Sequence, residues 1–428
     1  MSRCYRILIF APAFAPFTNP EAIVNTKLAL AFMEAGWQVD IITRDLAKES
    51  TYNYHCGWPQ NWLPLKMATH TVTYGVNGKI MRTLDTLRSA YRMGHLVEGC
   101  RWAAHAFDIA SILCAKEKYD FILSRSSPDA AHLPAMKLSA ITGTPWIANW
   151  NDPSDKKSPE PYGLGQNAHL GWAYERYLNL VGHNASFHTF PSRRLRNYIV
   201  GYLELKGINT SVIPHVAKKK LDATVYCKSD TFTITHAGHL SLERDPSKFL
   251  KAVSSLKHKY KLGNKIKVRI IGIVSQLTSQ LASQFGLEEN MEFTGSLSYE
   301  ETIKFLSQSD VNIIIEAQCV EGIFLPAKMA DYVQVGRPIM AISPKNGTLS
   351  DLLAEYNGGI ASDCTSGDAI YLALEKIYNK WRNGTLDEDY GNSKLYKALS
   401  QETVVDMYEK LFSFIEDHLP THERLVVR

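Results

Sequence analysis

The feature of this sequence that most restricts its fold is a repeated alternation of short apolar runs and amphipathic helical stretches. Residues 6–13 form an apolar run that ends in prolines, and residues 20–35 follow with apolar side chains at helical spacing. Gly36 ends that stretch, and a second apolar run occupies residues 38–43. Strand, helix and strand within about 40 residues make a βαβ unit, whose crossover favours a parallel sheet. Residues 119–150 contain a further unit of this kind.

The second half of the chain starts the same alternation again. Strands are predicted at residues 231–236, 267–272, 291–294, 311–316 and 338–342, and helices at residues 245–258, 276–285, 299–308, 326–335 and 348–356. Such a series is typical of a doubly wound α/β domain. A chain of 428 residues also exceeds what one hydrophobic core usually supports. We therefore predict two Rossmann-like, doubly wound domains that face a cleft, because such sheets bind ligands at their switch points.

Breaks in the pattern place the predicted domain boundaries. Gly207 and Pro214 interrupt the alternation, so the N-terminal domain is predicted to comprise residues 1–205 and the C-terminal domain residues 206–390. Residues 391–428 form a last helical segment, which we expect to cross back to the first domain.

Composition excludes several classes of protein. Hydrophobic residues make up 45% of the chain and charged residues 21%, which excludes a disordered or collagen-like protein. The seven cysteines lack metal-ligand spacing, which favours reduced cytosolic thiols over disulfides or a zinc site. The apolar start of the chain is predicted to be a buried strand and not a signal peptide, and no apolar stretch is long enough to span a membrane.

The positive charge of the chain is concentrated in its first half. Residues 1–200 carry 21 Lys and Arg against 15 Asp and Glu, whereas the remainder carries 26 against 28. A helical pattern predicted to run from Met81 to about Lys118 carries a row of arginines. These are Arg82, Arg88, Arg92 and Arg101. The stretch would either hold the domain against an anionic membrane or form an ordinary amphipathic helix packed on its own sheet. No nucleic-acid-binding motif accompanies the charge.

A glycine-containing loop follows the first predicted strand of the second half. Gly238 lies in this loop, and Asp245-Pro246 begins the next helix with residues suited to its N-cap and first turn. Arg244 would therefore lie beside free backbone N–H groups and the positive end of the helix dipole. This arrangement predicts a diphosphate site. The alternative is an ordinary strand–helix loop with a solvated arginine.

A second group of polar residues lies on the predicted helix at residues 326–335. Helical spacing brings Lys328, Asp331 and Tyr332 near one face. Because this helix follows a strand that ends near Glu316, its N-terminus would point into the same cleft. An acid here would accept hydrogen bonds from ribose hydroxyls, and Lys328 would meet phosphate or sugar oxygens. The alternative is a surface Lys–Asp pair.

Taken together, these segments resemble the retaining GT-B glycosyltransferases, close to glycosyltransferase family 4 and to its bacterial members that build surface polysaccharides. The resemblance covers most of the chain. Its segments are GWQVDIIT, SSPDAAHLPAMKLSAITGTPWIANWNDP, HAGHLSLERDP, MEFTGSLSYEETIKFLSQSDVNIII and LPAKMADYVQVGRPIMAI. The last of these resembles the family's PxKxxEY…GxP template, with Asp331 in the place of the glutamate.

The resemblance implies a set of donor-binding residues in the C-terminal domain. Arg244 would bind the donor diphosphate, Lys328 would lie near the phosphate or sugar, and Asp331 would bind the ribose. The remaining implied residues are Gly238, His239, Gly322, Ile323 and Phe324. His239 stands where many relatives carry arginine. Family members do not use a metal held by Asp-x-Asp, so neither metal nor cofactor is expected, and side-chain cations and helix N-termini would meet the leaving-group charge.

The resemblance also implies candidate catalytic residues. Asp152, in the sequence Asn-Asp-Pro, matches an acid of the N-terminal domain near the acceptor, and the alternative is a structural turn or cap. His132 lies on the helix before that strand, where it would be either catalytic or an ordinary core or surface residue. Family members carry two glutamates in this region. Glu321 lies near the place of the first and Asp331 at the place of the second, although Glu321 and Asp331 are further apart in sequence than the family's two glutamates.

The resemblance implies a metal-independent transferase. It would move a sugar, with retention, from a nucleotide-diphosphate-sugar to a glycan or lipid-linked acceptor in bacterial surface polysaccharide biosynthesis. The expected location is cytoplasmic, at the inner face of an anionic membrane, and no nucleic acid is expected as a partner. One alternative is a nucleotide-sugar epimerase of the same fold, which would need paired acids and a histidine around one sugar carbon. Another is a catalytically degenerate nucleotide-sugar-binding protein.

Overall fold

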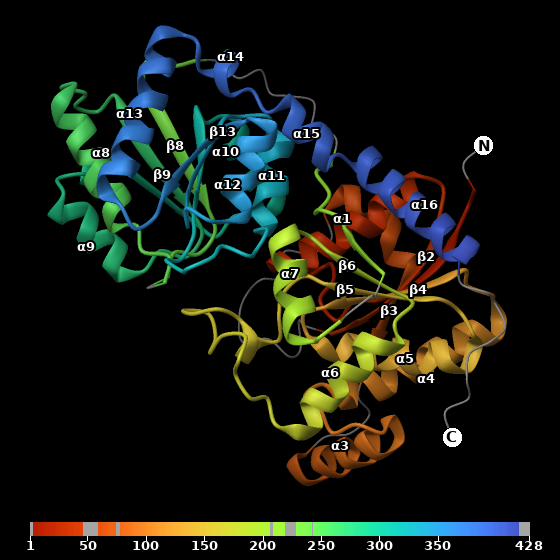
Figure 1. The fold of residues 1–428 in the computed structure, drawn as a ribbon. Helices are drawn as coiled ribbons and strands as arrows, with labels where there is room; N and C mark the ends of the chain where they lie inside the picture. Colours follow the sequence, from red (N-terminus) through yellow and green to blue (C-terminus); the bar gives the residue numbers. More distant parts are fainter. Residues whose placement is uncertain are drawn as a thin grey trace. The chain divides into compact units, whose positions relative to one another are not determined.

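The computed structural model describes residues 3–45, 59–73, 78–205, 209–218, 228–241 and 243–418 (Figure 1). These residues form two compact units. Unit 1 is drawn from Met1–Ser158, Gly163–Val216 and Gln401–Arg428, and unit 2 from Pro159–Tyr162 and Ala217–Ser400. Each unit contains a parallel sheet covered by helices, which confirms the predicted pair of Rossmann-like α/β folds.

Among the described residues, the sheet of unit 1 has seven parallel strands in the order β3-β2-β1-β4-β5-β6-β7. The strands are β1 (Arg6–Phe10), β2 (Gln38–Arg44), β3 (Thr69–Val72), β4 (Phe121–Ser126), β5 (Trp146–Trp150), β6 (Phe187–Phe190) and β7 (Thr210–Val212). The helices are α1 (Pro20–Glu34), α3 (Lys79–Met93), α4 (Cys100–Lys116), α5 (His132–Thr142), α6 (Trp172–Asn184), α7 (Arg193–Tyr202) and α16 (Gln401–His418), with short 3-10 helices at η1 (Gln60–Ala68), η2 (Asp129–Ala131) and η3 (Asp155–Lys157). The strand order reverses between β1 and β4, where Ile7 pairs with Phe121.

The basic helical stretch differs from its prediction. Instead of one helix from Met81 to about Lys118, the structure has α3 and α4. Gly94 and Gly99 separate them, and both glycines have a backbone φ of 80°. A side chain would be strained in that left-handed conformation, so the two glycines end one helix and allow the chain to turn into the next.

The C-terminal helix α16 returns to unit 1, as predicted. Its Tyr408 ring meets Phe32 of α1 edge-on with centroids 5.0 Å apart, and its Phe412 ring stacks on Phe121 of β4 at 4.1 Å. Both α16 aromatics are almost completely buried. The first core therefore contains residues from both ends of the chain.

Among the described residues, the sheet of unit 2 has six parallel strands in the order β10-β9-β8-β11-β12-β13. The strands are β8 (Phe232–Ala237), β9 (Ile266–Ile271), β10 (Met291–Gly295), β11 (Val311–Ile315), β12 (Ile339–Ser343) and β13 (Gly359–Asp363). The helices are α8 (Ser247–Lys259), α9 (Gln276–Gln284), α10 (Tyr299–Ser307), α11 (Ala327–Val335), α12 (Thr348–Tyr356), α13 (Gly367–Asn383), α14 (Leu386–Tyr390) and α15 (Ser393–Leu399), with a 3-10 turn at η4 (Glu288–Asn290). The five strands and five helices predicted for this half all form, with ends shifted by at most two residues.

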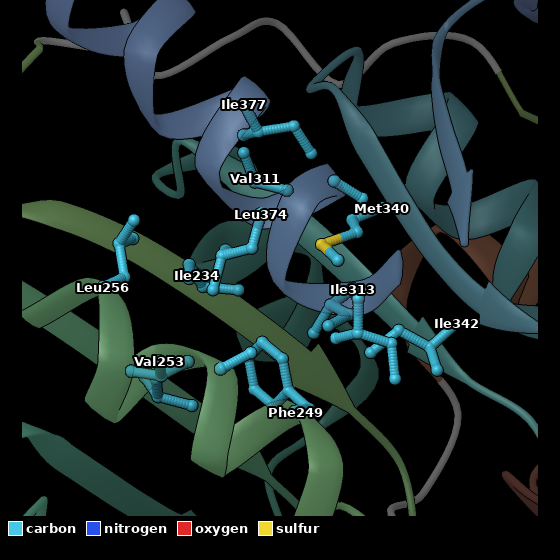
Figure 2. Packing of buried hydrophobic residues seen from close by; sticks show 14 of the residues in the cluster. Ile234, Phe249, Val253, Leu256, Val311, Ile313, Met340, Ile342, Leu374 and Ile377 are labelled. Atoms are coloured by element: carbon cyan, nitrogen blue, oxygen red, sulfur yellow. The ribbon is translucent and has the colours of Figure 1, made fainter. Parts of the chain in front are cut away.

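Two hydrophobic clusters hold the sheet of unit 2 between its helices. On one face, apolar side chains of β8, β11 and β12 pack against α8 and α13 (Figure 2). Phe249 of α8 and Leu374 of α13, for example, belong to the same cluster as Ile313 of the central strand β11. Its neighbour Ile314 points to the other face, in the cluster that contains Met329 of α11, because successive strand residues alternate between faces. The central strands are thus fixed from both sides, and so are the loops at their carboxyl ends.

Candidate functional site

The predicted donor-binding segments of unit 2 meet where its strand order reverses. The reversal lies between β8 and β11, in which Ile234 pairs with Val311. Residues 238–246 follow β8, and residues 316–326 lead from β11 to α11. Doubly wound proteins bind ligands at this position because loops leaving the carboxyl ends of the two strands diverge there.

Lys328 and His236 lie side by side at this switch point. Lys328 is in the first turn of α11, and its Nζ is 3.5 Å from Nε2 of His236. Nδ1 of the same ring is 3.0 Å from the carbonyl oxygen of Ile313, so Nδ1 carries the hydrogen and Nε2 accepts from the ammonium. Burial and the Lys328 charge lower the pKa of His236 well below its ordinary value, so the ring is neutral.

The environment of Lys328 is unfavourable for a cation. Burial, followed by the neighbouring Arg244 charge, lowers the pKa of its ammonium to about 8 against the opposing effects of Glu316 and Asp331. The N-terminus of α11 carries a partial positive charge of its own. Two cations gathered at the start of a helix are electrostatically costly without an anion, so this geometry favours binding of a negatively charged ligand.

Gly238 makes room for this lysine. Its backbone φ is +121°, and a Cβ added to it would lie 2.8 Å from Lys328 Nζ. The backbone conformation requires glycine at the end of β8, and a side chain there would also displace the Lys328 ammonium group.

Arg244 lies against an aromatic residue from a distant part of the chain. Its Cζ is 5.5 Å from the centroid of the Tyr162 ring, which belongs to the short segment Pro159–Tyr162 of unit 2. Tyr162 in turn meets Phe324 edge-on, with centroids 5.4 Å apart. Arg244 Nε is buried, and no described residue accepts a hydrogen bond from it. The guanidinium is thus supported by a ring while a donor remains for a ligand.

An acidic residue, Glu316, directly follows β11 beside the two cations. Burial raises the pKa of Glu316, while Arg244 and Lys328 act in the opposite direction. Its Oε1 is buried and has no hydrogen-bond partner among the described residues. A buried carboxyl group with an unused oxygen is suited to hydroxyl groups of a bound ligand.

The predicted donor-sugar segment, residues 322–324, is fixed by its backbone. Gly322 N–H donates to Asn346 at 2.9 Å, and its carbonyl accepts from Thr348 N–H at 2.8 Å. Thr348 Oγ1 also donates to the carbonyl of Ile323 at 3.0 Å, and Ile323 is buried. An added Cβ on Gly322 would lie only 3.2 Å from the Gly347 backbone, which explains glycine there. The segment places the ring of Phe324 against Tyr162.

Asp331 and Tyr332, one turn further along α11, have structural contacts. Asp331 is buried and accepts a hydrogen bond from the Tyr299 hydroxyl at 2.8 Å. The Tyr332 hydroxyl accepts from the Ala237 N–H at 2.8 Å and donates to the Ile313 carbonyl at 3.2 Å. Tyr332 therefore holds the ends of β8 and β11 at the switch point.

Two other candidates of unit 2, His239 and Glu321, are exposed. The chain also contains one Asp-x-Asp sequence, at residues 387–389 on α14. Asp387 pairs with Arg337 at 3.3 Å and Asp389 pairs with Lys380, so both carboxylates are engaged locally. Among the described residues, no group of three or more His, Cys, Asp or Glu side chains is arranged to hold a metal ion.

In unit 1, Asp152 lies at the carboxyl end of β5 beside an acid that the sequence did not single out. Burial, followed by the Asp152 charge, raises the pKa of Glu21 well above its ordinary value. Glu21 accepts a hydrogen bond from Asn151 Nδ2 at 3.0 Å, and buried Arg125 donates to Asn25 Oδ1 at 2.7 Å. The switch point of unit 1 thus contains a pair of neighbouring carboxyl groups.

His132 lies in the core of unit 1. It has no exposed surface, its Nδ1 is 2.8 Å from Ser124 Oγ, and its ring lies 4.4 Å from that of Trp150. Burial lowers the pKa of His132 to about 3, so the ring is neutral. These contacts are those of a core histidine, and they leave the ring no surface for a substrate.

Helix α3 has an unusually apolar exposed surface. Its exposed large apolar residues are Ile80, Met81, Leu84, Leu87 and Tyr91, which together we call the α3 face. Of the four predicted basic residues, Arg92 pairs with Asp108 and Arg101 with Asp85, whereas Arg82 and Arg88 are exposed. None of the described helices is long and apolar enough to cross a membrane.

Three residues of the donor cluster were not singled out from the sequence, and they differ in how much signal the sequence contains for them. Glu316 directly follows an apolar run of strand type, so it was a detectable candidate. His236 lies within a strand and differs from a core histidine only through its contact with Lys328. Tyr162 gave no signal, because the sequence does not show that its segment joins unit 2.

Comparison with known proteins supports this description. Residues 218–394, less than half of the chain, match the family model described as "Glycosyl transferases group 1". No curated protein sequence matches the chain.

Solved structures with the same fold cover nearly the whole chain. HepE of Anabaena, solved with UDP and glucose, is 13% identical with a TM-score of 0.63, and the match covers 96% of this chain and 100% of that one. A sucrose-phosphate synthase of Thermosynechococcus elongatus is 14% identical with a TM-score of 0.68, covering 96% and 99%. A protein of Listeria monocytogenes described as a UDP-N-acetylglucosamine 2-epimerase is 11% identical with a TM-score of 0.57, covering 99% and 100%. The chain thus combines the two-domain GT-B fold with a C-terminal unit that matches the group 1 glycosyl transferases.

Proposed function

We propose that this protein transfers a sugar from a nucleoside-diphosphate-sugar to a glycan or lipid-linked acceptor. The single observation that carries the proposal is the pair of neighbouring cations, Lys328 and Arg244, at the switch point of unit 2. A diphosphate would offset their repulsion and use the free donor on Arg244 Nε. The match of this unit to group 1 glycosyl transferases and the UDP bound by HepE support the same ligand class.

In this proposal, the cations stabilise the leaving diphosphate as its bond to the anomeric carbon breaks. Fixed charges that meet charge developing in the transition state are a major source of catalysis. Glu316, with its unused Oε1, would accept hydrogen bonds from hydroxyl groups of the donor. Asp331, whose carboxylate also accepts a hydrogen bond from Tyr299, would bind the ribose, as the resemblance to family 4 implies. We further propose that the anomeric configuration is retained and that no metal is required, since Arg244 and Lys328 supply the positive charge.

Substitution of Arg244 tests the donor site. Arg244→Ala removes charge-assisted hydrogen bonds that typically contribute about 1.5–3 kcal/mol, so the Kd for UDP should rise about 10- to 100-fold. Calorimetry with UDP measures this, and a panel of UDP-, GDP-, CMP- and dTDP-sugars identifies the donor through slow release of free nucleotide. Wild-type turnover should persist in EDTA, and NMR of the product should show the anomeric configuration of the donor.

The matched control is Arg382→Ala, which removes an exposed arginine from α13 of the same unit. It should leave the Kd for UDP unchanged, and both variants should keep the wild-type Tm. Wild-type UDP affinity in a folded Arg244→Ala variant would contradict the donor-site assignment.

We also propose that the α3 face contacts an anionic membrane that holds the acceptor. Ile80 is 78% exposed and Tyr91 is 91% exposed, while Arg82 and Arg88 lie on the same helix. Apolar residues at an interface next to Lys or Arg are typical of peripheral membrane helices. The exposed apolar surface supports this proposal over the alternative, an ordinary amphipathic helix packed on its own sheet.

Vesicle binding tests this contact. Each basic residue near an anionic surface contributes about 1 kcal/mol, so Arg82→Gln with Arg88→Gln should weaken binding to phosphatidylglycerol-rich vesicles about 30-fold. Leu84→Ser with Leu87→Ser should weaken it too. Leu372→Ser on α13 of unit 2, where the leucine is even more exposed, should not. Equal sedimentation of all variants, or equal binding to pure phosphatidylcholine, would contradict the proposal.

The second candidate function is nucleotide-sugar epimerisation. It is favoured by the neighbouring carboxyl groups of Glu21 and Asp152 in unit 1, because an epimerase needs paired acids. Incubation with UDP-N-acetylglucosamine separates the two functions. Epimerisation at C2 without acceptor would favour this candidate, whereas release of UDP would favour transfer.

A further inference from the structure

Unit 1 contains a pocket of ≈ 560 Å³ that is separate from the residues discussed so far. Its walls come from residues 96–98, 127–130, 154–156 and 170–174, which lie in the connections around α4, α5 and α6. This volume is within the range of small-molecule sites, which usually combine apolar walls with a few fixed polar groups. The pocket has both features.

The fixed polar group is the carboxyl group of Asp129. Asp129 is 6% exposed, and its Oδ2 accepts hydrogen bonds from the hydroxyl groups of Ser154 and of Tyr174, the latter at 2.8 Å. Its carbonyl oxygen accepts from the Tyr177 hydroxyl at 2.7 Å. No described residue donates to Oδ1. The side chain is therefore held in one orientation by its neighbours, with an acceptor left for a ligand in the pocket that it lines.

The apolar wall includes two aromatic side chains. Trp172, the first residue of α6, is 75% exposed although it lines the pocket, and Arg176 lies over its ring at 5.6 Å. Tyr174 packs edge-on against Tyr177, which fixes its position. A large exposed indole beside an orienting carboxyl group offers a flat apolar surface and a hydrogen-bond acceptor to the same ligand.

The charge of the pocket restricts that ligand. Its charged lining residues are Glu98, Asp129, Asp155 and Lys156, so acids outnumber bases. This lining is less favourable for a phosphate or another anion than for a neutral ligand. A neutral molecule with several hydroxyl donors and an apolar face would satisfy both walls, and a pyranose ring has this chemistry.

We propose that this pocket binds one uncharged sugar residue, with a sugar hydroxyl donating to Asp129 Oδ1 and the ring lying against Trp172. Only the assignment of this sugar to the acceptor rests on the proposed function. The pocket then fixes the acceptor class as a glycan with a neutral sugar, held by unit 1 independently of the donor cations.

Saturation-transfer NMR on the full chain, without nucleotide, tests the proposal. The probes are the methyl glycosides of glucose, galactose, mannose, rhamnose and N-acetylglucosamine. At least one should bind, and Trp172→Ala should raise its Kd about tenfold, a loss of about 1.4 kcal/mol, because the indole provides the apolar surface for the sugar ring. Asp129→Asn should weaken binding as well. The control is Leu164→Ala, which removes a side chain of unit 1 about as exposed as Trp172 and should not weaken binding.

Because Trp172 is exposed, its replacement should not change the Tm, so this variant decides the matter even if Asp129→Asn is unstable. The absence of binding to every glycoside, or equal binding by Trp172→Ala and the wild type, would overturn the proposal. UDP binding distinguishes its failure from that of the proposed function. Loss of the glycoside site should leave UDP affinity intact, and Arg244→Ala should weaken UDP binding but not glycoside binding.

Discussion

At the scale of single residues, the site of unit 2 depends on how burial changes ordinary side chains. Lys328, Glu316 and His236 all have pKa values shifted in the direction that disfavours charge, with burial as the largest cause. Water is therefore largely replaced by protein around them, and interactions between a ligand and these groups are strengthened. Arg244 remains charged, because its pKa is raised despite burial.

This gives a pH prediction for Lys328. Its pKa is about 8, so the ammonium form is present below pH 8 and is lost as the pH rises through that value. Only the ammonium form attracts a diphosphate, so UDP affinity should fall as the pH rises from 7 to 9, and UDP binding should be accompanied by proton uptake near pH 8.

Calorimetry in buffers with different ionisation enthalpies measures both effects. Lys328→Arg stays charged at every pH tested and should lose the decrease and the proton uptake. Arg244 does not titrate in this range, and His236 is neutral throughout it. A pH dependence shared by Lys328→Arg would assign the titration to another group.

At the scale of secondary structure elements, the core of unit 1 includes a helix from the other end of the chain, α16. The buried apolar residues of α16 are Val404, Val405, Tyr408, Leu411, Phe412 and Ile415. Complete burial of a large apolar side chain contributes about 1.5–3 kcal/mol, so their sum is comparable with the net stability of a typical domain. Unit 1 therefore requires this helix to fold.

A single substitution tests this dependence. Phe412 is 1% exposed among Tyr5, Trp37 and Phe121, so Phe412→Ala should lower the free energy of unfolding of unit 1 by about 3–5 kcal/mol. Phe414→Ala, two residues along the same helix and 39% exposed, should cost much less. Urea denaturation with hydrogen exchange of unit 1 amides measures both. Equal losses would show that α16 contributes through its helical backbone and not through this buried face.

At the scale of the whole molecule, hydrophobic periodicity predicted the two sheets well and the site only in part. The apolar runs of β8, β9, β11 and β12 are long and flanked by helical patterns, so their order in the chain was clear. Strands β6 and β7 are short, and β7 is Thr-Ser-Val, which has no alternation to detect. The prediction of one continuous helix across residues 94–99 was wrong. A single glycine does not interrupt a helical sequence pattern clearly, whereas in the structure Gly94 ends α3 and Gly99 precedes α4.

The candidate site also contains residues that the sequence predicted and residues that it did not. Arg244, Gly238 and Lys328 lie on segments adjacent in the fold because strand order follows from the βαβ rule. Tyr162, which contacts Arg244, and Asp129, in the pocket of unit 1, depend on packing between segments far apart in sequence, and no local pattern encodes that. His132 was a candidate because of its residue type, but only its burial among Ser124 and Trp150 shows its contacts.

The return of α16 to unit 1 has a consequence for biosynthesis. Residues 217–400 contain the sheet and both hydrophobic clusters of unit 2, and all of them leave the ribosome before α16 does. At ordinary translation speeds of about 5–20 residues per second, the first unit waits roughly 10–40 seconds between the end of β7 and the synthesis of its last helix. During that interval the surface that later binds Tyr408 and Phe412 is uncovered on the nascent chain. Unit 2 can thus fold before unit 1 is complete, whereas N-terminal domains usually fold first during synthesis.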